Sequence, residues 1–214
     1  MKIKLPVLLL LLLPVYTFSA DHYYYGNEKV QLDPRTDKIA FVLNNEYSEN
    51  AVRNRLSQYL ENEVELSKIM PKVYLISFAE TKTSGEMQGY LDNISAQSDI
   101  VKLVTLTYYG TSKKVTQIPA DVIMVRLRNT NDKDRLDILN INNHCTIIGK
   151  LSGEKGFLIK SNSSVTKNAL ELSEDYYSTG LFEFAEPDFI YPEKCILLSI
   201  PNDYSSTIAY MLYT

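Results

Sequence analysis

The sequence predicts an α+β protein made of two tandem ferredoxin-like modules of the split β-α-β type, with antiparallel sheets and the helices of each module on one face. Two observations lead to this fold class. Strand-length apolar stretches alternate with amphipathic helical stretches in the order strand, helix, strand, helix, strand over residues 38–109. A second series, strand, helix, two strands, helix, strand, follows over residues 122–189. That series is the plan of a four-stranded antiparallel sheet with two helices on one face.

The first module, residues 21–115, is expected to begin with a β-hairpin. Gly26-Asn27 is a two-residue loop of the type that closes hairpins. Ser48 and Ser84 each precede apolar residues at helical spacing, so both are expected to cap a helix. The second strand of the plan is expected to be reduced, to residues 64–66. The other strands are expected at residues 23–25, 28–32, 38–43, 73–78 and 101–109.

The second module, residues 116–192, shows clearer patterning. Along residues 122–127, apolar positions alternate with Met124 and Arg126, which indicates a strand with one buried face and one wet face. The polar residues 111–120 are interpreted as the connection between the modules. Four strands are expected, at residues 122–127, 146–151, 156–160 and 182–189. A short helix is expected at residues 132–142.

The last helix of this module has marked ends. Ser163 or Ser164 is expected to cap its beginning, and Gly180 is expected to stop it. The strand that follows should bury one side against the helix, because successive side chains of a strand point to opposite faces. The residues expected beneath the helix, near Leu172, are Phe182 and Phe184.

The first twenty residues predict export. Lys2 and Lys4 precede an apolar run over residues 5–15, and small residues follow, which is the layout of a secretory signal peptide, residues 1–20. The run is short for a membrane-spanning helix, which favours a cleaved signal peptide. A retained signal anchor is the alternative. With no cysteine near the cleavage region, a lipoprotein is not expected. The mature protein is therefore predicted to be periplasmic or extracellular, with no membrane attachment after cleavage.

Composition narrows the classes of partner. Without Lys2 and Lys4 the chain has 20 basic and 26 acidic side chains, a formal net charge of −6. A surface of that sign repels phosphate backbones, so nucleic-acid binding is not expected. The 16 tyrosines suit an interaction surface on an exported protein.

The end of the chain, residues 193–214, is interpreted as a C-terminal tail that can form a β-hairpin about Asn202-Asp203. It contains Cys195, one of two cysteines. The predicted topology places Cys145 and Cys195 at opposite ends of the sheet, whereas a disulfide needs Cα atoms within about 7 Å. Two free thiols are expected, and a disulfide is the alternative that export leaves open.

No catalytic residue, metal ligand set or cofactor site is predicted. The only histidines are His22, close to the expected new N-terminus, and His144, which precedes Cys145 at a turn where adjacent side chains diverge. Gly110-Thr111-Ser112 is interpreted as a turn. The cysteines and histidines show no close pair at metal-ligand spacing. The chain is therefore expected not to be an enzyme.

Several short motifs are similar to those of one protein family. The helix residues Ala169-Leu170-Glu171-Leu172, the stop Ser178-Thr179-Gly180-Leu181 and the strand residues Phe184-Ala185-Glu186-Pro187-Asp188-Phe189-Ile190 resemble the propeptide of secreted Bacteroides-type subtilisin-like serine proteases. The segment Pro201-Asn202-Asp203 is similar to the entry into such catalytic domains. The catalytic domain itself is not found, because only 24 residues follow Ile190.

The resemblance implies a protein-binding role. Such propeptides dock the outer face of their sheet on the protease, and by position Glu186 and Asp188 match an acidic pair that faces helix N-termini of the enzyme. The alternative is that Glu186-Pro187-Asp188 only turns the chain. The implied function is that of a non-catalytic inhibitor of, or folding assistant for, a subtilisin-like protease. An exported binding or structural module, or a truncated remnant of a pro-region, are the alternatives.

Overall fold

The computed structural model describes residues 22–60, 64–110, 114–162 and 167–192. Within them the fold is α+β, and every strand pairing is antiparallel, which confirms the prediction of an α+β protein with antiparallel sheets. Strands β1 (His22–Tyr25) and β2 (Glu28–Gln31) form a separate two-stranded sheet. Gly26 has a φ of +59° in their turn, a conformation that glycine adopts at little cost, so the predicted hairpin is confirmed.

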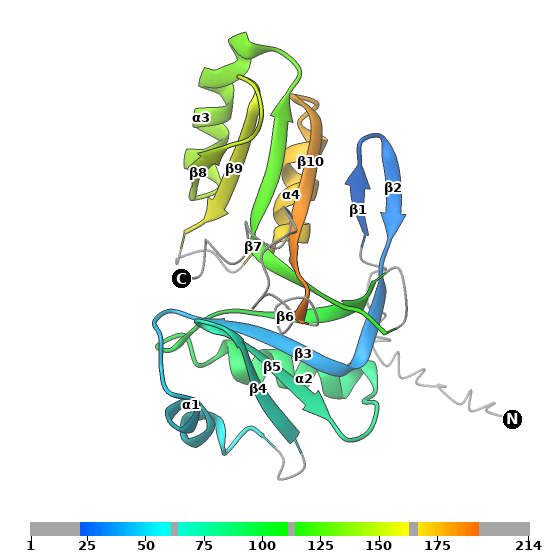
Figure 1. Ribbon diagram of the computed structural model, residues 1–214, viewed down its shortest axis with the longest axis vertical. Helices are drawn as coiled ribbons and strands as arrows, with labels where there is room; N and C mark the ends of the chain where they lie inside the picture. The colour runs from blue at the N-terminus through cyan, green and yellow to red at the C-terminus, as the bar shows by residue number, and fades with distance from the viewer. Residues whose placement is uncertain (1–21, 61–63, 111–113, 163–166, 193–214) are drawn as a thin grey trace, which may run out of the picture.

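The next part of the chain, called the first unit, forms the lower half of the molecule in Figure 1. Its sheet has the order β4-β5-β3-β6, so its strands follow one another in space as second, third, first and fourth in the chain. The elements are β3 (Asp33–Leu43), α1 (Glu49–Leu56), β4 (Val64–Met70), β5 (Val73–Phe78), α2 (Ser84–Ser95) and β6 (Val101–Tyr109).

The second unit forms the upper half and has the order β8-β9-β7-β10, again second, third, first and fourth in the chain. Its strand β7 also pairs with β6 of the first unit through Thr116 and Gln117, so one eight-stranded sheet runs through both units. The elements are β7 (Thr116–Leu127), η1 (Thr130–Asp132), α3 (Lys133–Asn142), β8 (Cys145–Lys150), β9 (Gly156–Ser161), α4 (Ala169–Ser178) and β10 (Phe182–Ile190).

Two helix caps differ from the sequence prediction. Ser48 caps α1 as expected. The cap of α2 is Thr83 instead of Ser84, because Thr83 and Glu86 form a reciprocal capping box. The cap of α4 is Asn168, in a capping box with Glu171, whereas the expected caps Ser163 and Ser164 lie outside the described residues. Gly180 follows α4 with a φ of +70° and ends it as predicted.

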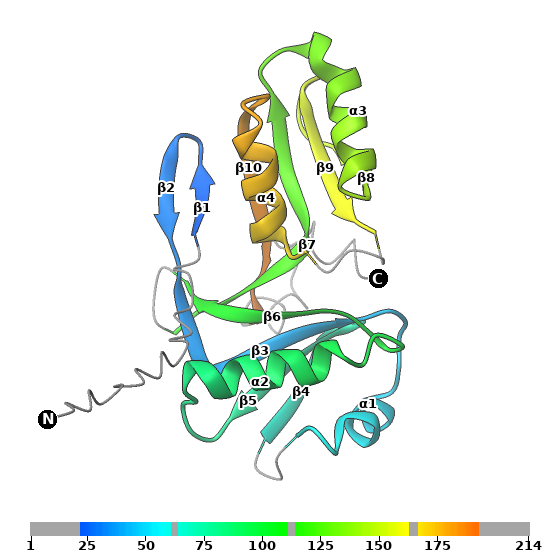
Figure 2. The same cartoon turned by 180° about the vertical axis from the view of Figure 1, so that it is seen from behind.

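In each unit both helices pack against the same face of the sheet. One core joins residues of α1 and α2 to β3 and β5, and a second joins residues of α3 and α4 to β7, β9 and β10. Figure 2 shows α3 and α4 together in front of the second unit's strands. A third core lies on the other face of the first unit's sheet, where Ala40, Val42 and Leu103 meet Ile118, Ala120 and Ile190 of the second unit.

One predicted core residue is wrong. Phe182 is buried against Tyr176 of α4, with ring centroids 5.7 Å apart, but Phe184 is partly exposed. The register shifts between Phe182, opposite Leu127, and Phe184, opposite Arg126. This bulge at Glu183 reverses the alternation, so Ala185 joins the core in place of Phe184.

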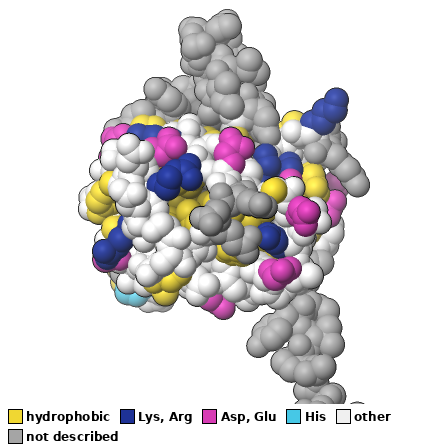
Figure 3. Space-filling view, turned by 90° about the horizontal axis from the view of Figure 1, so that it is seen from below, with side chains coloured by type: hydrophobic (Ala, Val, Ile, Leu, Met, Phe, Trp, Pro, Cys, Tyr) yellow, Lys and Arg dark blue, Asp and Glu magenta, His cyan; other side chains and the backbone are white. Residues whose placement is uncertain are grey.

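The lower end of the molecule, formed by the first unit, has charges of both signs. Acidic and basic side chains are interspersed there in the described part of the surface (Figure 3). Lys68 lies 2.7 Å from Glu46, Arg53 lies 3.7 Å from Glu49, and Arg55 pairs with Asp99. Exposed pairs of this kind contribute little to stability, so they are best understood as a mixed solvated surface.

Candidate functional site

The two predicted binding residues lie on β10, the strand beside β7 at the edge of the second unit. The alternative of a turn at Glu186-Pro187-Asp188 is wrong, because Glu186 and Pro187 continue the ladder opposite Met124 and Ile123. Proline is tolerated there because β10 pairs with β7 on one side only, and an edge strand can lose an N–H donor. Glu186 and Asp188 are thus held on a strand, but their surroundings differ.

Glu186 is partly exposed, and the N-terminal hairpin contacts it. Its Oε1 accepts a hydrogen bond from the backbone N–H of Gly26 at 3.4 Å. Aromatic contacts hold the hairpin in place: Tyr24 stacks on Tyr177 of α4 with centroids 4.1 Å apart, and Tyr23 meets the edge of Phe189. Burial raises the pKa of the Glu186 carboxyl, and the Gly26 N–H opposes that rise.

Asp188 is buried more deeply, with 7% of its surface exposed. Its Oδ2 has no hydrogen-bond partner among the described residues. A second register shift, between Pro187 and Phe189, places Asp188 in a bulge. Burial is the main cause that raises the pKa of the Asp188 carboxyl to about 7; the backbone N–H of Phe189 opposes this rise, and the negative charge of Asp121 adds to it.

A buried charged group lies where the two units meet, and the sequence analysis did not find it. Asp121 of β7, 1% exposed, pairs with Lys102 of β6, and Lys160 of β9 lies 4.0 Å from the same carboxylate oxygen. Lys102 also donates to the backbone carbonyl of Ser161 at 3.0 Å. We call Lys102, Asp121, Lys160, Ser161 and Asp188 the seam. An aspartate within the apolar run of residues 118–125 was the available signal, since carboxylates are rarely buried unless paired.

The second unit's sheet has a face without helices, which we call the outer face. Ile123 and Val125 point into the helix-covered core, so Met124 points outward together with its cross-strand neighbour Leu158. Both are partly exposed, as is Phe184. In Figure 1 this face of the strands is turned toward the viewer.

Charges border the outer face on two sides. Arg126 lies 3.0 Å from Glu183, and Lys155 lies 3.6 Å from the same carboxylate. Glu186 stands opposite Met124 at the other border. The outer face therefore combines a partly exposed apolar row with a polar rim, which is the anatomy of a protein-binding surface.

His144 and Cys145 do not come together as a catalytic pair. His144 has a φ of 51° at the turn after α3 and is exposed, whereas Cys145 is buried in the second unit's core. Burial raises the pKa of the Cys145 thiol, whose Sγ donates to the carbonyl of Asn143 at 3.3 Å. A raised pKa keeps the thiol protonated and weakly nucleophilic. Cys145 is a free cysteine, and Cys195, Thr111 and Ser112 lie outside the described residues.

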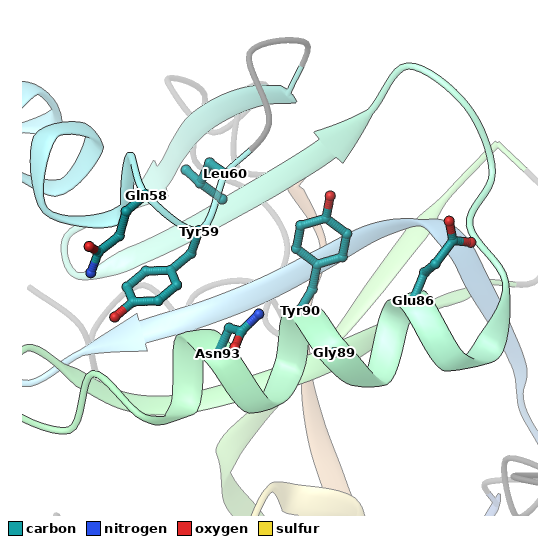
Figure 4. A pocket seen from close by; sticks show the side chains of 7 residues that line it. All are labelled: Gln58, Tyr59, Leu60, Glu86, Gly89, Tyr90 and Asn93. Atoms are coloured by element: carbon teal, nitrogen blue, oxygen red, sulfur yellow. The ribbon is translucent and has the colours of Figure 1, made fainter.

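Two shallow cavities lie beside α1 in the described part of the first unit. The larger, about 350 Å³, lies between the end of α1 and α2, and Figure 4 shows Tyr59 and Tyr90 on its two sides. Gln97 donates to the Tyr59 hydroxyl at 2.8 Å, and Phe78 lies 4.6 Å from the Tyr90 ring, so both tyrosines are held. The smaller, about 290 Å³, is lined by Tyr47, Ala51, Val52, Arg55, Asp99 and Ile100.

No helix in the described ranges is long and apolar enough to cross a membrane. Within the same ranges no three His, Cys, Asp or Glu side chains gather in a group that could hold a metal ion. A scan against protein-family models, a search of curated proteins and a search of solved structures each find no match.

Proposed function

We propose that this chain is a non-catalytic, exported binding module that docks on a subtilisin-like serine protease through its outer face, as an inhibitor or folding assistant. The observation that favours this most is the partly exposed row of Met124, Leu158 and Phe184 on a sheet face without helices. Apolar side chains on a two-layer fold are normally covered, so a row left accessible beside a polar rim suggests a partner.

We also infer that the two units are tandem ferredoxin-like modules. The repeated order of second, third, first and fourth strand supports this, as does the packing of both helices of each unit on one face. A module of this type leaves one face of its sheet free. In the first unit that face is covered by the second unit, so the outer face is the one available to a partner.

Glu186 is the acidic residue that this proposal assigns to direct contact. A carboxylate is stabilised by the unpaired N–H groups at a helix N-terminus. In the free protein Glu186 already accepts a backbone N–H, that of Gly26, so the residue is placed for this type of donor. Asp188 is only 7% exposed, and the proposal therefore gives it a role inside the protein instead of at the partner.

The test is a titration of protease activity against a panel of secreted subtilisin-like serine proteases. Phe184→Ala should raise the inhibition constant at least about tenfold if it lies at the centre of the interface. Glu186→Gln should raise it by about two- to thirtyfold, from the loss of a charge–dipole contact. Ile141→Ala is the matched control, because Ile141 is 72% exposed on α3, in the helix layer on the opposite side.

Two results would count against the proposal. One is that the wild-type protein neither inhibits any protease of the panel nor raises the refolding yield of its catalytic domain. The other is that Phe184→Ala and Ile141→Ala inhibit equally while circular dichroism shows both folded. The first result would favour the second candidate, an exported module that binds a small ligand, and the second would show that the protease is not bound through the outer face.

The larger cavity, shown in Figure 4, is the observation that favours this second candidate. Gly89 lies in the middle of α2, where glycine costs about 1 kcal/mol relative to alanine. A Cβ at Gly89 would meet nothing within 4 Å, so packing does not explain the glycine. Gly89→Leu would place a side chain in this cavity, between Tyr59 and Tyr90. Ligand binding that this substitution abolishes would support the candidate.

A further inference from the structure

Asp188 stands at the point where β10 passes from one core to the other. Pro187, before it, pairs with Ile123 of the second unit's core. Phe189, after it, belongs to the core of the first unit, and Ile190 belongs to the core between the units. The carboxyl of Asp188 is therefore buried at the junction of the two units, with one oxygen that has no hydrogen-bond partner among the described residues.

The charged groups around Asp188 do not compensate an ionised carboxylate there. From β7 the facing group is Asp121, which has the same sign. Lys102 of β6 and Lys160 of β9 lie against Asp121, and Lys72 acts on Lys160. The acidic groups of α4, the helix packed on β10, are engaged elsewhere: Glu171 in the helix cap, Glu174 at 3.8 Å from His22 of β1, and Asp175 at 2.5 Å from Lys167. Tyr23 of β1 contacts Phe189, and burial raises the pKa of its hydroxyl, so it is neutral and supplies no positive charge.

We propose that Asp188 makes the junction between the two units sensitive to pH, holding it closed while the carboxyl is protonated and loosening it when the carboxyl ionises. A protonated carboxyl is a neutral group of moderate burial cost. An ionised one is a buried charge with an unpaired oxygen beside Asp121, which is among the costliest arrangements in a protein interior. This proposal concerns the isolated protein and does not depend on any protease.

The direction of the effect follows from the two states. In the unfolded chain the Asp188 carboxyl has its ordinary pKa of 3.8, and in the folded protein burial raises this pKa to about 7. Well below pH 3.8 the carboxyl is protonated in both states, so Asp188 adds no pH dependence to the stability there. Between these values the folded state binds the proton more tightly, so stability falls as the pH rises, and the loss is complete above pH 7. The difference between 3.8 and about 7 is about three pKa units, which corresponds to about a thousandfold change in the unfolding equilibrium constant.

The first test compares urea unfolding of the wild-type mature protein, Asp188→Asn and Glu183→Gln between pH 4 and pH 8.5. Asp188→Asn should remove most of the fall in stability with rising pH and should be the more stable protein at pH 8. Glu183→Gln is the matched control on the same strand, where Glu183 is 41% exposed and paired with Arg126, and it should keep the wild-type pH dependence. Equal pH dependence of Asp188→Asn and wild type would overturn the proposal.

A second measurement needs no variant. The side-chain carboxyl of Asp188 can be titrated by carbon NMR in the wild-type protein, and an ordinary pKa near 4 would overturn the proposal. Hydrogen exchange then distinguishes the junction from the whole fold. Between pH 6 and pH 8.5, protection factors should fall most at Phe189, Ile190 and Ile118, and less at Ile76 and Ile159 within the two units. A uniform loss of protection would also contradict a device located at the junction.

Discussion

The two units have the same strand order but differ in how far their helix-free faces are buried. In the first unit this face is buried: Ala40 and Val42 are at most 2% exposed beneath Ile118 and Ile190 of the second unit. In the second unit the corresponding face keeps Met124, Leu158 and Phe184 partly exposed. Within the described chain, the helix-free face of the first unit therefore gains a third layer, and that of the second unit does not.

The largest expected effect is at the seam, which joins the units. Asp121→Ala leaves Lys102 buried without its carboxylate, and breaking a buried ion pair on one side costs about 3–5 kcal/mol. Glu183→Ala on the outer face removes a partly exposed pair and should cost about 0–1 kcal/mol. Urea unfolding of both variants measures the difference. If the two variants lost similar amounts of stability, the seam would be more hydrated than the 1% exposure of the Asp121 side chain indicates.

The next effect compares the two helix-free faces directly. Ile118→Ala removes a side chain that is fully buried against the first unit's sheet, and should lower the free energy of unfolding by about 2–5 kcal/mol. Leu158→Ala on the outer face should cost roughly 1 kcal/mol or less, because the side chain is already partly in water. If Leu158→Ala proved as costly as Ile118→Ala, the outer face would be part of the core, and its assignment as a docking surface would fail.

Local patterns in the sequence predicted much of this architecture. The alternation along residues 122–127 indicated which side of β7 is buried, and Gly26 and Gly180 marked a hairpin and a helix end. These signals are readable because each depends on neighbours within a few residues. They are also the reason that the helices and strands of both units were found in the right order.

Features that depend on pairing between distant segments were not predictable. The bulge at Glu183 exposes Phe184, yet nothing in the residues around it requires an extra residue opposite β7. Residues 111–120 were interpreted as a connection because the stretch is polar, whereas residues 116–120 belong to β7, with Pro119 opposite Phe189 in the ladder. The seam joins Lys102, Asp121 and Ser161, which lie on three strands and meet only in the folded chain.

The smallest expected effect concerns the caps of the two units' helices. Asn168→Ala removes an acceptor for the N–H groups of Leu170, at 2.9 Å, and Glu171, at 3.2 Å, and should cost about 0.5–2 kcal/mol. Thr83→Ala removes the hydroxyl that accepts a hydrogen bond from the backbone N–H of Glu86 at 3.3 Å. Its cost should fall in the lower part of the same range, because only one backbone N–H loses its side-chain acceptor.

Asn168 also reaches across the junction, since its Nδ2 donates to the Thr105 hydroxyl of the first unit at 3.5 Å. Asn168→Asp tells these roles apart: it keeps the oxygen that caps α4, improves the charge at the helix N-terminus and removes only the donor to Thr105. At 3.5 Å that bond is at the weak limit of hydrogen-bond geometry, so Asn168→Asp should match the wild type within about 0.5 kcal/mol. A cost for Asn168→Asp equal to that of Asn168→Ala would instead assign the residue to the contact between the units, and the helix cap would be incidental.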